Sequence, residues 1–121
     1  MNLIKPSLFC LALVSSAAFA EDCAIPEVPT LPDGATAGEP EMLAGQTAVR
    51  AYQAANTSYR VCLDEKMEPA EQAALGDESD PALANAVATL NNQYNASVAA
   101  EEEIAVKFNT ELRAYKAANP G

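Results

Sequence analysis

Apolar residues recur at helical spacing in two long stretches of this 121-residue chain. In the first stretch, over residues 38–67, they draw one continuous stripe that includes one polar residue: Met42, Val49, Tyr52, Asn56, Tyr59 and Leu63. In the second, over residues 81–118, the stripe is Val87, Leu90, Tyr94, Val98, Ile104, Phe108, Leu112 and Tyr115. Such spacing is typical of an α-helix with one buried face. Because the sequence has no strand-like alternation, we expect an all-α fold.

Turn and capping residues indicate where these helices begin and end. Thr36 and Glu39 stand at the spacing of a capping box, so the first helix is expected to begin near residue 38. Pro69 is expected to end it near residue 67, since proline disfavours helix in the residue before it. Asp80 followed by Pro81 is a cap and first-position pair, which predicts the start of the second helix. Two long helices with a short connection favour an antiparallel, coiled-coil-like hairpin.

A proline-rich segment precedes the first helix. It repeats an apolar-proline-polar triplet three times over residues 25–33. A polyproline II strand has three residues per turn, so Ile25, Val28 and Leu31 fall on one edge, which we expect to pack along the helices. Pro32-Asp33-Gly34 then has turn chemistry, in which Gly34 is able to take positive φ and reverse the chain. The segment is predicted to be an extended arm.

The first twenty residues have the organisation of an export signal. Lys5 gives the positive start, residues 8–14 the apolar stretch, and Ala18-Phe19-Ala20 a small-x-small cleavage site. We therefore expect cleavage after Ala20 and a periplasmic protein, with secretion from the cell as the alternative. No segment approaches about 20 consecutive apolar residues, so membrane insertion is not expected.

Two cysteines remain once the signal is removed, Cys23 and Cys62. An even count in an exported chain makes a disulfide the default interpretation. The thirteen arm residues that follow Cys23 span about 40 Å when extended, and the helix from residue 37 to Cys62 rises about 38 Å. An arm running back along this helix would bring the two sulfurs together. Closing the loop should contribute about 4 kcal/mol of stability.

The predicted organisation is one helical domain preceded by the arm. Its parts are a signal peptide at 1–20, an extended arm and turn at 21–37, a hairpin domain at 38–118 and a tail at 119–121. Within the hairpin, the first helix covers 38–67, an acidic connector 68–80 and the second helix 81–118. The connector has room for one or two helical turns of its own, which Gly76 would end. The longer second helix is expected to project past the first, where its last aromatic residues either cover the arm's turn or recruit a second copy.

Charge and composition exclude several classes of function. Without the signal, six basic residues stand against seventeen acidic ones, a net charge of about −11. Such a surface repels nucleic acid and anionic membranes. The chain has no histidine, no Gly-rich phosphate loop and no nucleophile-elbow motif, and a disulfide would leave no free thiol. We therefore expect no enzyme activity, no cofactor and no metal site.

Two polar residues stand on the apolar stripes. Asn56 lies on the first, where a polar residue often fixes the register between helices. Glu101 lies on the second, and because a buried carboxylate needs a partner, Arg50 or a tyrosine hydroxyl is expected beside it. Its neighbours Glu102 and Glu103 face other directions and cannot converge with it on one cation, so a solvated face is expected. The tyrosines of both stripes are expected in the core rather than around a ligand.

Several short motifs, taken as a set, resemble a group of small exported proteobacterial proteins with no assigned activity. The motifs cover nearly all of the chain after the signal: Cys23, Pro32-Asp33-Gly34, Met42, Tyr59-Arg60-Val61-Cys62-Leu63, Tyr94-Asn95, Phe108-Asn109 and Leu112-Arg113-Ala114-Tyr115-Lys116-Ala117. The resemblance implies a helical hairpin with a disulfide. It brings no catalytic residues to this sequence.

Together these features predict a non-enzymatic structural or protein-interaction module. The sequence does not identify its protein partner, and a homodimer that forms a four-helix bundle is one option. The alternative hypothesis is a binding protein or chaperone-like carrier, which would hold a small apolar ligand or an unfolded client against the aromatic stripe.

Overall fold

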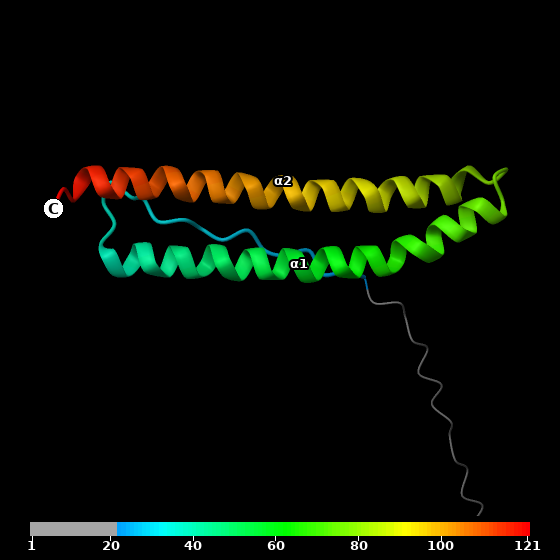
Figure 1. Ribbon diagram of the computed structural model, residues 1–121, viewed down its shortest axis with the longest axis horizontal. Coiled ribbons are helices and arrows are strands. Elements are labelled where there is room, and N and C mark those ends of the chain that lie inside the picture. Colours follow the sequence, from blue (N-terminus) through cyan, green and yellow to red (C-terminus); the bar gives the residue numbers. More distant parts are fainter. Residues whose placement is uncertain (1–21) are drawn as a thin grey trace, which may run out of the picture.

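A computed structural model describes residues 22–121 of the chain. Helix α1 spans Glu39–Gly76 and helix α2 spans Pro81–Ala118, each 38 residues long. They lie side by side and antiparallel, with the arm running along both of them (Figure 1). The predicted all-α hairpin is confirmed, and within the described range there are no strands. The predicted signal peptide and its cleavage site lie outside the described residues.

The core lies between the facing sides of the two helices. Its buried cluster consists of Met42, Val49, Tyr52, Ile104 and Phe108, against which Leu31, Ala37, Leu112 and Tyr115 pack. All six residues predicted for the first stripe are buried. On α2, Val87, Leu90 and Tyr94 are only partly buried, like Leu112 and Tyr115. The aromatic end of α2 therefore covers the arm's end and the start of α1, which is the first of its two expected roles.

Val98 is wrongly placed by the sequence pattern. It is 37% exposed, whereas its neighbour Ser97 is buried. Ser97 stands seven residues before Ile104 and so shares its face of α2, while Val98 is rotated from it by about 100°. The sequence pattern places Val98 on the buried face because it is apolar. Helical geometry instead places the smaller, polar Ser97 there.

The first helix continues well past its predicted end. It runs through Pro69 to Gly76, so the connector shrinks from the predicted 68–80 to residues 77–80. A proline inside a helix removes one hydrogen bond and bends the axis without always ending it. The last turns of α1 do bend toward α2 (Figure 1). Since the helices are equally long, the expectation that the second is longer than the first is also wrong.

Each helix begins at a capped end. At α1 the N-cap is Gly38, whose backbone N–H donates to the Glu41 carboxylate at 2.7 Å, so the expected cap at Thr36 and Glu39 is wrong by two positions. At α2 the Asp80 side chain accepts a hydrogen bond from the Ala82 N–H at 2.9 Å, as expected for a cap residue before a proline.

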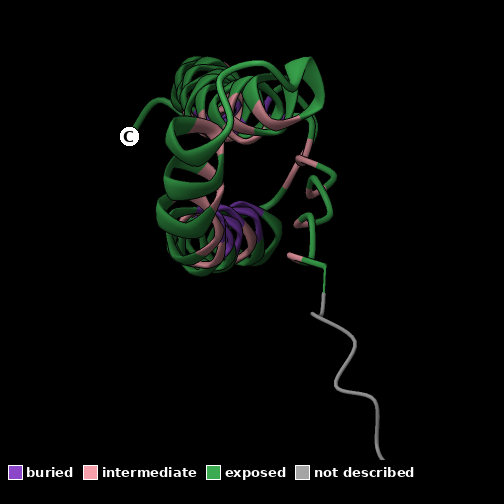
Figure 2. Ribbon diagram, turned by 90° about the vertical axis from the view of Figure 1, so that its right-hand side faces the viewer, coloured by how far each residue is buried: buried purple, intermediate pink, exposed green. Residues whose placement is uncertain are grey.

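The arm lies along one side of the hairpin (Figure 2). The edge predicted to pack is wrong for two of its three residues, because Ile25 is 76% and Val28 60% exposed, while Leu31 is partly buried. The partly buried positions are instead Pro26, Pro29 and Pro32. The three-residue period is therefore present, but its phase is shifted by one residue, so that the proline rings face the helices.

Candidate functional site

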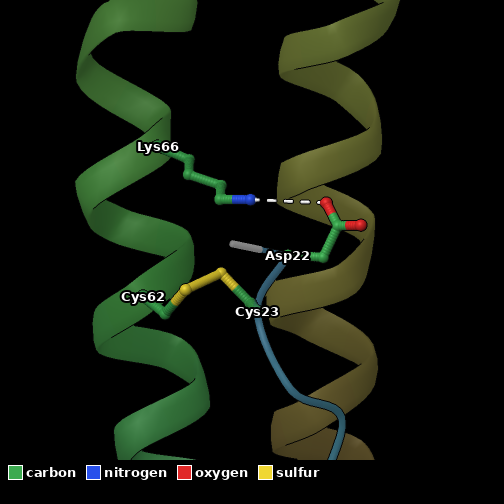
Figure 3. The surroundings of a disulfide bond; sticks show 4 residues. All are labelled: Asp22, Cys23, Cys62 and Lys66. Atoms are coloured by element: carbon green, nitrogen blue, oxygen red, sulfur yellow. Dashed lines mark ion pairs between the residues drawn. A yellow bond between two sulfur atoms is a disulfide. The ribbon is translucent and has the colours of Figure 1, made fainter. Parts of the chain in front are cut away.

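The N-terminal end of the arm is fixed by the predicted disulfide. Cys23 is bonded to Cys62 of α1, with their Cα atoms 5.7 Å apart (Figure 3). One helical turn further along α1, the Lys66 ammonium lies 3.7 Å from the Asp22 carboxylate. Because Asp22 is fully exposed, this ion pair adds little to the covalent link.

The other end of the arm is fixed by close packing at its turn. Asp33 accepts the backbone N–H groups of Thr36 and Ala37 through its carbonyl oxygen and that of Ala35 through its side chain. The Gly34 N–H donates to the Glu111 carboxylate of α2 at 2.8 Å. The expected positive φ at Gly34 is absent. Glycine is needed there because a Cβ would collide with the backbone carbonyl of Glu111.

A second glycine lets the arm approach α1. Gly45 is buried, and a Cβ built on it would lie 2.7 Å from Cδ of Pro32 and 3.2 Å from a ring carbon of Phe108. The proline ring therefore occupies space that any larger residue would take. The arm is thus held at both ends, by a covalent bond near Cys62 and by the turn against Gly45 and Glu111.

A polar network crosses between the helices beside the core. The Ser97 hydroxyl donates to Oδ1 of Asn56 at 2.8 Å, and Nη1 of Arg60 donates to Ser97 at 3.2 Å. The same nitrogen donates to Oε2 of Glu101 at 2.7 Å. The partner of Glu101 is therefore Arg60, and the expectation of Arg50 or a tyrosine hydroxyl is wrong. The network links one polar residue of each stripe, an arrangement that suits the predicted register role of Asn56.

One polar atom of this network has no partner. Asn56 is only 2% exposed, and its Nδ2 makes no hydrogen bond. A buried donor without a partner costs about 1–3 kcal/mol. Such an atom calls for a physical explanation, either a bound molecule or ion that supplies an acceptor or a cost that the fold accepts.

An uncharged groove runs between the arm and the hairpin, and we call it the arm groove. Its volume is about 300 Å³, and it is lined by Ile25, Pro26 and Val28 from the arm, Tyr52, Asn56 and Tyr59 from α1, and Gln93, Ala96, Ser97 and Ala100 from α2. Two of the four tyrosines expected in the core, Tyr52 and Tyr59, therefore also line the arm groove. A neighbouring hollow of about 280 Å³ continues past Ile25 and Tyr59 toward the disulfide.

The charged residues gather in a different groove. It includes Arg60, Tyr94, Glu101 and Glu102 and has a volume of about 420 Å³. Nearby, the Lys107 ammonium donates to the exposed Glu103 carboxylate at 2.6 Å and holds the pKa of that carboxyl below its ordinary value. Among residues 22–121 no group of acidic residues and cysteines is arranged to hold a metal ion.

Some of these residues could have been found from spacing alone. Ser97 and Glu111 stand seven residues before and after Ile104, so all three share one face of α2. A search restricted to apolar residues passes over both polar ones. No comparable signal pairs Arg60 with Glu101, because that pairing depends on the register of the two helices.

Comparisons with known proteins give no relative, since no family model, no curated protein and no solved structure matches the chain. In the part of the chain that the structure describes, neither helix has a stretch apolar and long enough to cross a membrane.

Proposed function

We propose that this chain is an exported, non-enzymatic protein-interaction module that recognises its partner through the arm. The observation that carries the proposal is the exposure of Ile25 and Val28, which are 76% and 60% exposed on an arm fixed at both ends. We call these two residues the arm edge. A freely moving tail would also expose apolar residues, but this arm is held by the disulfide and by the Gly34–Glu111 hydrogen bond.

The spacing of the arm edge indicates the chemistry of the partner. The two side chains stand three residues apart in a proline-rich segment, so they project from the same side of an extended chain. Segments of this kind dock into aromatic-lined grooves of partner domains. Because the arm is already held extended, binding costs less conformational entropy than it would for a free peptide. The partner we propose is a protein domain with such a groove.

Export to the periplasm, after cleavage following Ala20, is part of the same proposal. It is supported by the signal-like first twenty residues and by the Cys23–Cys62 disulfide, since disulfides persist mainly in oxidising compartments. The non-enzymatic part fails if the purified protein turns over any substrate and loses this activity when one polar residue is substituted.

The proposed interaction is tested by photo-crosslinking in the exporting cell. A benzophenone amino acid at Thr30, exposed on the arm beside the edge, is expected to give one discrete protein adduct. Val28→Asp should abolish the adduct, whereas Val106→Asp should leave it intact, because Val106 is an equally exposed apolar residue of α2. An adduct that survives Val28→Asp contradicts the proposal. So does an adduct of twice the chain's mass, which would identify a second copy instead of a foreign partner.

A carrier of a small apolar ligand is a second candidate function. The uncharged arm groove beside the buried tyrosines favours it.

A further inference from the structure

The arm groove combines an apolar lining with one unsatisfied hydrogen-bond donor. We propose that it binds a small neutral apolar molecule that carries a carbonyl oxygen, and that Nδ2 of Asn56 donates the hydrogen bond to this oxygen. The inference rests on the second candidate function and needs no protein partner. Its failure would therefore leave the proposed role of the arm edge untouched.

The orientation of the Asn56 amide follows from its neighbours. Arg60 donates to the Ser97 oxygen, and the Ser97 hydroxyl hydrogen then goes to Oδ1 of Asn56. If the Asn56 amide were turned over, its nitrogen would face Ser97, which already accepts a hydrogen bond from Arg60. The Ser97 hydroxyl hydrogen and the Asn56 carbonyl oxygen would then both lack a partner. The network therefore fixes the nitrogen as the free group, and the complementary ligand atom is an acceptor.

The lining of the groove selects a neutral ligand. No charged side chain lines it, and the chain as a whole carries a net charge of −10, which works against an anion such as a carboxylate. Two tyrosines and two alanines provide apolar walls. A volume of about 300 Å³ is at the lower end for ligand sites, which typically range over about 300–1,000 Å³.

Access to the donor depends on the arm. Nδ2 of Asn56 is covered from solvent, so a ligand reaches it only if a neighbouring segment moves. The middle of the arm lines the same groove, and we assign the movement to it. That segment, which includes Pro26 and Val28, lies between the two fixed ends. Its movement therefore requires neither the disulfide nor the Gly34–Glu111 hydrogen bond to break.

Two neutral naphthalene-based fluorescent probes, of which only one has a carbonyl group, distinguish binding through a hydrogen bond from binding through apolar contact alone. The first, 6-propionyl-2-dimethylaminonaphthalene, is a neutral naphthyl ketone, and the second, N-phenyl-1-naphthylamine, is neutral and apolar without a carbonyl. Both are titrated against the oxidised protein and against the variant Asn56→Leu. We expect this substitution to weaken binding of the ketone about tenfold, as for the loss of one hydrogen bond. Binding of the amine should not change.

Control variants locate the site. Asn109→Leu replaces an exposed asparagine of α2 and should change neither titration. Ala100→Phe places a ring in the arm groove and should weaken both probes. The inference is overturned if the ketone does not bind, if Asn56→Leu weakens both probes equally or neither, or if ketone binding survives Ala100→Phe.

A spectroscopic measurement decides the matter if Asn56→Leu does not fold. The carbonyl stretching band of the ketone bound to the unsubstituted protein is compared with its band in hexane. A shift to lower frequency shows that the carbonyl accepts a hydrogen bond and supports the inference. A band at the hexane position overturns it.

Discussion

The carboxylate of Glu111 accepts a hydrogen bond from the backbone N–H of Gly34, 77 positions earlier in the chain, at 2.8 Å. This contact joins the turn of the arm to the last part of α2. It is the polar counterpart of the disulfide, which joins the other end of the arm to α1. The covalent bond therefore fixes one end of the arm to α1, and this hydrogen bond fixes the other end to α2.

Substitutions at this contact should destabilise the fold in two distinct ways. Glu111→Ala removes a charge-assisted hydrogen bond and should lower the free energy of unfolding by about 1–2 kcal/mol. Gly34→Ala should cost about 2–3 kcal/mol, because its Cβ would press on the Glu111 backbone. Urea unfolding measures both. Glu102→Ala, at an exposed position of α2, is the control and should change the free energy by less than about 0.5 kcal/mol. Equal effects of Glu102→Ala and Glu111→Ala would show that the contact is not stabilising.

Loss of the disulfide should lower stability without unfolding the helices. The double substitution Cys23→Ser and Cys62→Ser should reduce the free energy of unfolding by about 4 kcal/mol, since it releases the loop closure of the unfolded chain. Adding a reductant to the unsubstituted protein should have the same effect, and it should not affect the double variant. If oxidised and reduced protein unfold at the same urea concentration, the bond contributes nothing to stability.

The Arg60–Glu101 pair should be coupled more strongly than an exposed pair on the same molecule. Its side chains are 17% and 25% exposed, and the arginine also donates to Ser97. A double-mutant cycle with Arg60→Met and Glu101→Gln should give a coupling energy of about 1 kcal/mol. The exposed pair Lys107–Glu103 within α2 is the control, and its coupling should be smaller and should vanish in high salt. The same coupling for both pairs would contradict the expectation.

Much of the fold could be predicted because it depends on local patterns. The helical stripes, the cap at Asp80 and the even cysteine count each specify a feature through a few nearby residues, and the hairpin and its disulfide follow from them. The first stripe was clear because apolar residues such as Met42 and Leu63 occupy most of its positions.

The errors arose where two arrangements satisfy the same local pattern. A three-residue period allows either Ile25 or Pro26 to face the helices, and only contact with the hairpin decides between them. Pro69 is compatible with a helix end or with a bend, and the local sequence does not decide between them. The candidate site was harder still, because Asn56 gave no sign in the sequence that one of its amide hydrogens would lack an acceptor.

The position of the disulfide in the chain leaves α2 outside the covalent ring. Cys23 and Cys62 both precede α2, so the ring encloses only the arm and most of α1. The four residues 77–80 are then the sole covalent connection of α2 to the arm and α1 in the described chain. A protease that cuts this turn would produce two separable fragments, one cyclised and one linear. Their tendency to reassociate would measure the strength of the interface between the helices directly.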